Sequence, residues 1–336
     1  MGDAPLILGH DGPVIGPTLA RHLADRAGAD PTRQSLAALI SGLAEASVAV
    51  ADRLARGRLP GDPTASVGRN ESGDTQKAMD MAAHDHLLAA MRGLPVARVL
   101  SEEAEEIVTL NPEGLFDVAM DPVDGSGSIG IGAPLGALFA VFPAGETFLR
   151  SGRDVIAAAY VSFGHSVDVG VSMGEGVSIA TLDRATGRFH LDEMHVTLPE
   201  ETDTVAFNAS NMRRWPDWLQ RYTDDLLHGA EGPRGRDFNM RWLAAAVGDL
   251  HRILRRGGVF LYPADPRPGY EAGVLRLAYE AFPIAFLIEQ AGGSATDGRR
   301  DILDLVPAQL HDRVPLIFGS RDEVATLRVY HDTSRR

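Results

Sequence analysis

Asp121-Pro122-Val123-Asp124-Gly125-Ser126 is the stretch that decides the fold and the chemistry, together with Ser101-Glu102-Glu103 about 20 residues earlier. Each follows an apolar run, residues 116–120 and 96–100, that predicts a buried strand. Open α/β sheets bind their ligands at the carboxyl ends of strands. Carboxylates gathered there repel one another, and Mg²⁺, which prefers oxygen ligands, removes that repulsion. The glycine and serine after the last aspartate offer backbone N–H groups as a phosphate cradle. The pattern therefore indicates metal-dependent hydrolysis of a phosphate ester.

Three more carboxylates extend this acidic set. Asp74 lies in a Gly-bounded loop, and Asp80 lies early in a predicted helix, where it could act as a base toward a metal-bound water. Glu280 lies among apolar residues of another predicted helix, so it is either exposed or a ligand. Structural interpretations also exist: Asp74 suits an N-cap, the glutamates an exposed helix start, and the D-P-V-D-G-S stretch a surface turn. Their joint occurrence after apolar strands favours the catalytic interpretation.

The bulk composition limits the class of protein. A chain of 336 residues predicts two domains, which we divide near Pro199 into residues 1–199 and 200–336. The absence of cysteine excludes disulfides and thiolate ligands and suits a reducing cytoplasm. No signal peptide is recognisable at the N-terminus, and no window approaches 18 uncharged apolar residues, so we expect no membrane span. A formal charge of −14 argues against nucleic acid as a partner.

Hydrophobic periodicity predicts helices alternating with strands along the chain. Helices are predicted at residues 36–54, 76–91, 216–227, 243–254 and 275–290, the last ended by Gly292-Gly293. Strands are predicted at residues 155–171 and 177–191 with a hairpin between them, and at 204–208, 259–262 and 314–318. Residues 234–256 carry six arginines, which either form a solvated face or contact an anionic substrate.

Two other site types are disfavoured. Residues 125–130 fit G-x-G-x-x-G, but a dinucleotide there would place its pyrophosphate beside the aspartates Asp121 and Asp124, which repel it without a metal. His84 and His86 are two residues apart on a predicted helix and so do not share a face for metal binding.

At these motifs the chain resembles the class I fructose-1,6-bisphosphatases, within the lithium-sensitive, Mg²⁺-dependent sugar-phosphatase superfamily that includes inositol monophosphatases, and it is most similar to the bacterial type. The resemblance runs from about residue 70 to residue 322. The matching stretches are N-E-S-G-D-T-Q-K-A-M-D (70–80), V-L-S-E-E (99–103), D-P-V-D-G-S (121–126), G-R-D-V-I-A-A-A-Y (152–160), V-G-D-L-H-R (247–252), G-G-V-F-L-Y-P-A (257–264), L-R-L-A-Y-E (275–280) and I-E-Q-A-G-G (288–293). The resemblance implies an α+β or α/β fold, a layered αβαβα sandwich of two domains, the metal and 1-phosphate site in the first and the sugar and 6-phosphate site in the second.

The resemblance also implies roles for individual residues. Two or three Mg²⁺ ions, with Mn²⁺ as a substitute, would be held by Glu102, Glu103, Asp121, Asp124, Glu280 and the Val123 carbonyl. The catalytic residues would be Asp74, Asp80 and Glu103, the last two polarising the attacking water. Substrate would contact Asp124, Gly125, Ser126, Asn208, Arg241, Tyr262 and Arg276, with Arg241 supplied by a neighbouring subunit of a homotetramer. The implied reaction converts fructose 1,6-bisphosphate to fructose 6-phosphate and phosphate, in gluconeogenesis or the Calvin cycle.

The chain departs from the family pattern mainly on the sugar side. Val274 stands where a basic residue normally reaches the sugar phosphate, and Trp242 stands where a tyrosine normally meets the 6-phosphate. The alternatives are therefore a sedoheptulose-1,7-bisphosphatase or another sugar-phosphate phosphatase, and, less favoured, a non-catalytic regulatory homologue. Animal-type members bind AMP through a Gly-Thr-Gly-Glu-Leu-Thr-like turn, a Lys-Tyr pair and an arginine. Residues 30–43 lack that turn, Leu115-Phe116 align with the pair, and the arginine aligns near Pro143.

Overall fold

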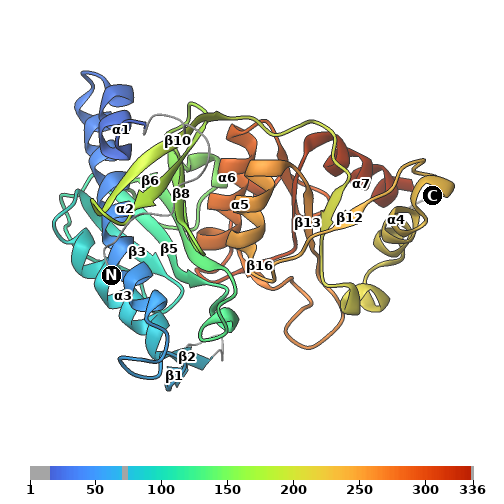
Figure 1. Cartoon of the computed structure of the whole chain (residues 1–336), viewed down its shortest axis with the longest axis horizontal. Helices are drawn as coiled ribbons and strands as arrows, with labels where there is room; N and C mark the ends of the chain where they lie inside the picture. The colour runs from blue at the N-terminus through green and yellow to red at the C-terminus, as the bar shows by residue number, and fades with distance from the viewer. Residues whose placement is uncertain (1–15, 70–74, 334–336) are drawn as a thin grey trace, which may run out of the picture.

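The computed structural model describes residues 16–69 and 75–333, and its elements stack in five layers, helices alternating with sheets (Figure 1). The αβαβα sandwich expected from the sequence is confirmed. The helices are α1 (Leu19–Ala27), α2 (Pro31–Ala55), α3 (Ala78–Met91), α4 (Asp217–Leu227), α5 (Ala246–Arg256), α6 (Phe282–Gln290) and α7 (Arg321–Thr333).

The larger sheet has eight strands in the order β10-β9-β8-β7-β6-β5-β3-β4. They are β3 (Val96–Ser101), β4 (Val108–Thr109), β5 (Phe116–Asp124), β6 (Leu135–Pro143), β7 (Ala157–Phe163), β8 (Val167–Ser172), β9 (Val177–Asp183) and β10 (Arg188–Val196). Only β3 and β5 run parallel; the other neighbours are antiparallel. The two acidic motifs therefore leave neighbouring strands at the same edge.

Both faces of this sheet are covered. Along β6, Phe139 and Val141 pack with α1, α2 and α3, whereas Leu138, Ala140 and Phe142 pack with α5 and α6. This alternation is the period of two that a pleated strand imposes. Because every residue of β5 is buried, the acidic side chains that it carries are delivered into the protein interior.

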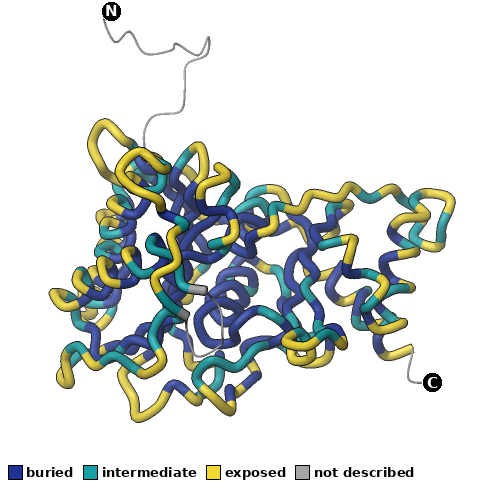
Figure 2. Tube along the Cα trace, turned by 90° about the horizontal axis from the view of Figure 1, so that it is seen from below, coloured by how far each residue is buried: buried dark blue, intermediate teal, exposed yellow. Residues whose placement is uncertain are grey.

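The smaller sheet has the order β12-β11-β13-β17-β15 and closes the other side of the α5–α6 layer. Its strands are β11 (Thr204–Ala206), β12 (Asn239–Met240), β13 (Val259–Tyr262), β15 (Ser294–Thr296) and β17 (Leu316–Gly319). Its outer face packs on α4 and α7. Figure 2 shows the buried trace running through the interior of both halves, with exposed residues on the outer turns. Two small ribbons complete the fold, β1 (Ser66–Arg69) with β2 (Thr75–Lys77), and β14 (Leu275–Arg276) with β16 (Arg313–Val314).

Three element predictions need correction. Residues 155–171 and 177–191 are not single strands: each folds into a two-stranded hairpin, turning at residues 164–166 and 184–187, so that β7 to β10 form a meander. Residues 275–290 are not one regular helix. They begin as β14, pass through a π-helical turn (Leu277–Ala281), and become α-helical only from Phe282. The predicted stop at Gly292-Gly293 is confirmed, because Gly293 N–H bonds to the Ile288 carbonyl (2.9 Å) and Gly292 has φ +84°.

Helix α2 is long and apolar enough to cross a membrane by length and composition, which the sequence analysis did not expect. About half of its apolar window is buried inside the protein, and its buried residues pack against the sheet. Core helices pass the same test. The chain passes from the larger to the smaller sheet between Val196 and Thr204. The domain division at Pro199 lies in this crossing and stays a prediction.

Candidate active site

A β-bulge aims the two aspartates of the D-P-V-D-G-S motif to one side. On β5, Asp121 pairs with Leu138 and Asp124 with Gly136, so three steps on one strand oppose two on the other. Strict alternation would point these side chains to opposite faces, and the extra residue cancels that alternation. Val123 instead packs into the core under α1 to α3, and its N–H donates to Asp121 Oδ1 (2.8 Å).

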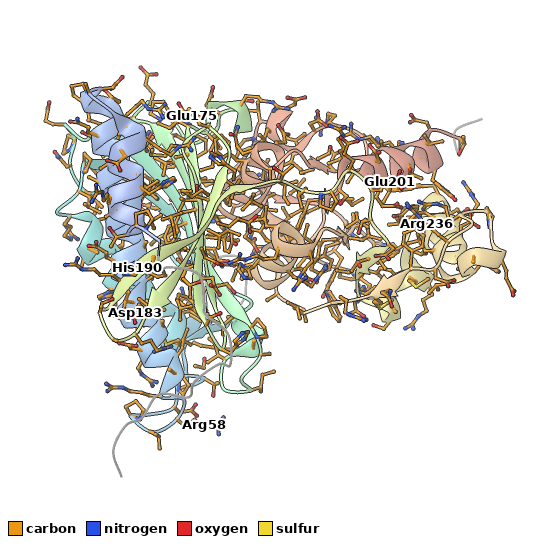
Figure 3. All side chains as sticks on the ribbon, turned by 45° about the horizontal axis from the view of Figure 1, so that its top comes forward. Arg58, Glu175, Asp183, His190, Glu201 and Arg236 are labelled. Carbon is orange, nitrogen blue, oxygen red and sulfur yellow. The ribbon has the colours of Figure 1, made fainter. Side chains whose placement is uncertain are left out.

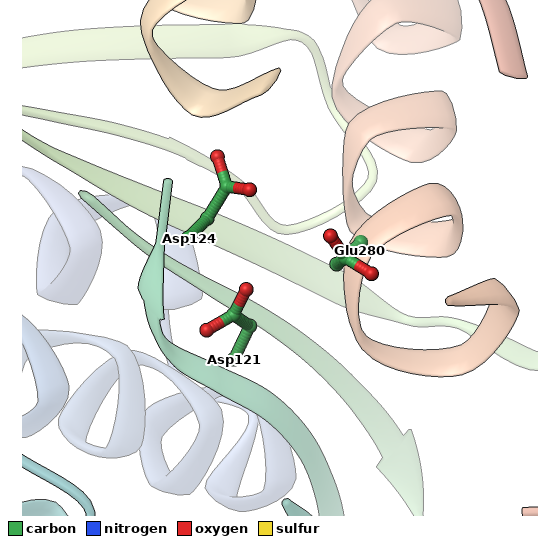
Figure 4. Close-up of side chains that lie close together, drawn as sticks. All are labelled: Asp121, Asp124 and Glu280. Carbon is green, nitrogen blue, oxygen red and sulfur yellow. The ribbon is translucent and has the colours of Figure 1, made fainter. Parts of the chain in front are cut away.

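Asp121, Asp124 and Glu280 form a buried cluster of three carboxylates. Each offers an oxygen within 4.8 Å of the others, and Figure 4 shows the three side chains converging from β5 and from the π-helical turn. That turn is a frequent device at functional sites. Here the turn carries Glu280, one residue before its end, and the Glu280 carboxylate accepts the Arg276 N–H. Arg276, a residue that is 3 % exposed, lies beside the cluster as a nearby positive charge.

The electrostatics of the cluster fit a cation. Burial, with repulsion from Glu102 as the next cause, raises the pKa values of Asp121 and Glu280 well above their usual range. Burial likewise raises the pKa of Asp124 to about 6, although its carboxylate accepts the Val247 N–H (2.6 Å) at the start of α5. Protonated carboxyls are the response of such groups to missing counter-charge. Oxygen donors without nitrogen or sulfur are the set that Mg²⁺ prefers.

Glu102 and Glu103 follow β3 directly and join the site differently. The carboxyl group of Glu102 hydrogen-bonds to that of Asp121, and burial followed by repulsion from Glu103 raises the pKa of Glu102 to about 7. Glu103 is held by Gln76, whose amide nitrogen donates to its Oε2 (2.7 Å) and its carbonyl (3.1 Å).

Asp80 lies in the first turn of α3, and only one of its two carboxylate oxygens is hydrogen-bonded within the described part of the chain. Its Oδ2 accepts the Lys77 N–H (3.1 Å), whereas its buried Oδ1 has no hydrogen-bond partner among the described residues. Burial raises the pKa of Asp80 to about 6, and the charge of Glu103 adds to that rise. Because buried polar atoms are normally paired, Oδ1 marks a place for a water, ion or substrate atom.

The phosphate cradle predicted after β5 has the geometry of a tight turn. Gly125 has φ +80°, and a Cβ there would lie 2.6 Å from the Cβ of Ala245, so only glycine fits. Residues Ser126–Ser128 then form a 3₁₀ turn closed by Ser128 N–H to the Gly125 carbonyl (2.8 Å). The Ser126 carbonyl accepts a hydrogen bond from Lys77 Nζ (2.5 Å).

The sugar-side residues come from the second half of the chain. Asn208 caps the turn after β11 through its Oδ1, which accepts the Ser210 N–H (3.1 Å). Tyr262 ends β13 half-buried, with a pKa raised to about 12 mainly by burial. Val274, where the resemblance predicts a basic residue, is half-buried.

Arg241 is exposed and follows Met240, which is 37 % exposed, and precedes Trp242, which is 40 % exposed. The preceding loop is tethered to α7 by Glu323, which accepts two hydrogen bonds from Arg234, each 2.8 Å long. Arg236 adds bonds to Glu323 (3.1 Å) and to Glu201 (2.9 Å; Figure 3).

The structure thus gathers Asp121, Asp124, Glu280 and Glu102, with Glu103 and Asp80 as a second group near them. Asp74 lies outside the described residues, and the N-cap of α3 is Lys77. Sequence reasoning missed Gln76, Lys77 and the Val247 N–H. Composition alone could have pointed to Lys77, the chain's single lysine.

Comparisons with known proteins identify the family of this chain. The family profiles described as "Fructose-1-6-bisphosphatase, N-terminal domain" and "Fructose-1-6-bisphosphatase, C-terminal domain" match residues 17–194 and 198–332. Proteins named fructose-1,6-bisphosphatase class 1 from Brucella anthropi and Brucella suis are each 50 % identical over 330 residues, covering 97 % of both chains. Fructose-1,6-bisphosphatase of Leishmania major in its holo form superposes with a TM-score of 0.86 at 28 % identity, covering 94 % of this chain and 99 % of the other.

Proposed function

The chain belongs to the fructose-1,6-bisphosphatase class 1 family, and from this premise we propose that it hydrolyses the 1-phosphate of fructose 1,6-bisphosphate, giving fructose 6-phosphate and phosphate. The observation that carries the proposal is the buried triad of Asp121, Asp124 and Glu280 one residue away from the Gly125–Ser128 turn. Oxygen ligands for cations and N–H groups for a phosphate are then adjacent, which is what hydrolysis of a phosphate monoester requires.

The carboxylates of Glu102, Glu103, Asp121, Asp124 and Glu280, with the Val123 carbonyl, are the proposed ligands of two or three Mg²⁺ ions, or of Mn²⁺ in their place. Divalent ions bound there would neutralise the carboxylates, polarise the phosphoryl oxygens and lower the pKa of a bound water. Four of these carboxyls, those of Glu102, Asp121, Asp124 and Glu280, have pKa values raised mainly by burial and further by repulsion from nearby carboxylates, which supports a counter-charge as part of the working site.

The chain's own residues supply orientation and proton transfer. The N–H groups of Gly125 and Ser126 would bind the 1-phosphate, and the Ser126 hydroxyl would add a third donor. Asp80 would orient the attacking water and accept its proton at Oδ1, the buried oxygen without a partner among the described residues. Glu103, held in place by Gln76, would act with Asp80, and Asp74 is proposed as a further catalytic carboxylate.

For the sugar and its 6-phosphate we propose Asn208, Tyr262 and Arg276 of one subunit. Arg241 would come from a neighbouring subunit of a homotetramer; its exposure, with that of Met240 and Trp242, supports a role outside its own subunit. We further propose a cytoplasmic enzyme of gluconeogenesis or the Calvin cycle that works on a small sugar bisphosphate, without nucleic acid or membrane partners.

Val274 is the reason for considering a second substrate. A valine at this half-buried position offers no charge to a sugar phosphate, so sedoheptulose 1,7-bisphosphate or another sugar phosphate is the alternative. The test is phosphate release from a panel of sugar mono- and bisphosphates with Mg²⁺, with and without chelator. We expect fructose 1,6-bisphosphate to give the highest kcat/KM. A higher value for the seven-carbon bisphosphate would overturn the substrate assignment, and no release from any member would overturn the reaction class.

A further inference from the structure

Lys77 is the only lysine of a chain that holds 32 Lys and Arg residues in total. Every other basic position is arginine. The one exception is half-buried at the junction of β2 and α3, directly beside the acidic site. Lysine differs from arginine in carrying a compact point charge on a flexible stem instead of a planar fork.

The backbone N–H and the side-chain ammonium of Lys77 donate to different parts of the site. Its backbone N–H donates to Asp80 Oδ2 (3.1 Å), which caps α3 and would persist whatever the side chain. Its Nζ donates to the Ser126 carbonyl (2.5 Å), across 49 positions of sequence. That carbonyl also accepts the Ile129 N–H (3.1 Å), which closes the 3₁₀ turn. The side chain thus acts on the phosphate cradle, and the backbone acts on the helix.

The cradle needs such a contact because its two glycines are restrained unequally. Gly125 is packed against Ala245, whereas a Cβ on exposed Gly127 would meet no described atom within 4 Å. The peptide between Ser126 and Gly127 is therefore not fixed by packing from that side. The Ile129 N–H holds the Ser126 carbonyl from within the turn, and the Lys77 ammonium adds a second, charged donor that fixes the plane of this peptide and with it the direction of the Gly127 N–H.

We propose that Lys77 is the positioning residue of the phosphate cradle: through the Ser126 carbonyl its ammonium orients the Ser126–Gly127 peptide toward the phosphate group of the substrate. The positive charge also offsets the carboxylates that surround a phosphate dianion in this site. The inference rests on the proposed function for the identity of that phosphate. It adds a residue that the acidic motifs do not contain.

Because the chain contains no cysteine, a single introduced cysteine can be modified selectively, and this allows a direct test of the proposal. In the variant Lys77→Cys the new thiol is the only one in the chain. With 2-bromoethylamine, the thiolate displaces bromide and forms a thioether that carries a primary ammonium at lysine's length. Bromoethane forms the matched thioether without the charge. The three proteins, compared with the parent, separate the effect of the ammonium from the effect of side-chain volume.

We expect Lys77→Cys to lose about tenfold to a hundredfold in kcat/KM with saturating Mg²⁺, the range of one charge-assisted hydrogen bond. Aminoethylation should restore most of that loss and ethylation should not. Thermal unfolding and its shift by Mg²⁺ should stay near the parent's in all three proteins, because the helix cap and the acidic cluster are intact. A Lys77→Cys variant within twofold of the parent, or equal rescue by the two reagents, would overturn the proposal.

Affinity for inorganic phosphate in the presence of Mg²⁺, measured by calorimetry, keeps the two proposals separable. We expect the phosphate affinities to follow the same order as the kcat/KM values. The parent and the aminoethylated protein should bind phosphate tightly, and the Lys77→Cys variant and the ethylated protein should bind it about tenfold more weakly or worse. If the parent hydrolyses no sugar phosphate but this order holds, the proposed function fails and the role of Lys77 stands. If turnover is normal but phosphate affinity is the same in all four proteins, the role of Lys77 fails alone.

Discussion

The stabilisation of the protein by Mg²⁺ should depend steeply on pH, because the acidic site holds protons when it holds no metal. Burial and repulsion raise the pKa of Asp124 to about 6 and that of Glu102 to about 7. Between the ordinary values near 4 and these raised values, the folded protein binds protons that the unfolded chain has released. The contribution of these groups to stability therefore falls as pH rises through that window and levels off above about pH 7. At about pH 8 the carboxyl groups of Asp124 and Glu102 are ionised in the metal-free protein and repel each other.

The size of the effect follows from the shifts. One pKa unit corresponds to about 1.4 kcal/mol, so the rise of Asp124 from 3.8 to about 6 is worth roughly 3 kcal/mol in a group that is only 5 % exposed. Its neighbours add to this, though not independently, because they interact. Most of the Asp124 shift lies below pH 5.5, so between about pH 5.5 and about pH 8 Asp124 contributes about 1 kcal/mol, and Glu102, whose pKa rises from 4.5 to about 7, contributes about 2 kcal/mol. At roughly 2–4 °C per kcal/mol for domains of this size, the Mg²⁺-induced rise in Tm should be larger at about pH 8 than at about pH 5.5 by about 5 °C or more.

The assay is thermal unfolding in Mg²⁺ or in chelator at both pH values. At each pH, the difference between the Tm in Mg²⁺ and the Tm in chelator removes the contribution of every group whose titration does not depend on the metal. Asp124→Asn should reduce this pH-dependent difference in Tm, because it removes the titration of Asp124 and its repulsion of Glu102. Glu289→Gln is the matched control, since Glu289 is also a carboxyl whose pKa burial raises, but it pairs with Arg153 (2.5 Å) outside the cluster. Equal Mg²⁺ shifts at the two pH values, or equal losses in the two variants, would refute the reasoning.

Three further outcomes follow from the same site. Asp124→Asn should lower kcat about 10²-fold or more at saturating Mg²⁺, since it removes one ligand charge; activity within a few-fold of the parent would make Asp124 a turn residue only. Val274→Lys should raise kcat/KM for fructose 1,6-bisphosphate about tenfold or more in steady-state kinetics, by adding a charge-assisted hydrogen bond; no gain would mean that another group already serves the substrate. AMP should not inhibit, because the Asp30 carboxylate already accepts the Thr32 and Arg33 N–H groups (2.8 and 3.1 Å) at the start of α2 and would repel a phosphate; half-inhibition at micromolar AMP in an activity titration would reveal a site of another kind.

The sequence was most informative where chemistry and secondary structure coincide. Apolar runs before the two acidic motifs became β3 and β5, parallel neighbours that bring Glu102 and Asp121 together. The features that could not be predicted from the sequence are local irregularities in a strand and in a helix. The bulge between Asp121 and Asp124 breaks the period of two, and the π-helical turn at Glu280 interrupts the period of 3.6, so regular templates misplace both.

Contacts between residues far apart in the chain also could not be predicted from the sequence. The Val247 N–H reaches Asp124 across 123 positions, because Gly136 allows α5 to approach the sheet: a Cβ there would lie 2.9 Å from the Val247 methyls. The hairpins within residues 155–171 and 177–191 were missed because tight turns leave little signal between two apolar strands. Charge and composition could not show which residues tether the Arg241 loop, since Glu323 lies more than eighty positions away from its arginine partners.

Phosphorus NMR of fructose 1,6-bisphosphate during turnover tests the central claim most directly. With Mg²⁺ present, we predict that the 1-phosphate signal is lost, that inorganic phosphate appears in equal amount, and that the 6-phosphate signal persists. Excess chelator should stop the reaction, and added Mg²⁺ should restart it. Undiminished turnover in excess chelator, or loss of the 6-phosphate signal in place of the 1-phosphate, would contradict a metal-dependent 1-phosphatase built on Asp121, Asp124 and Glu280.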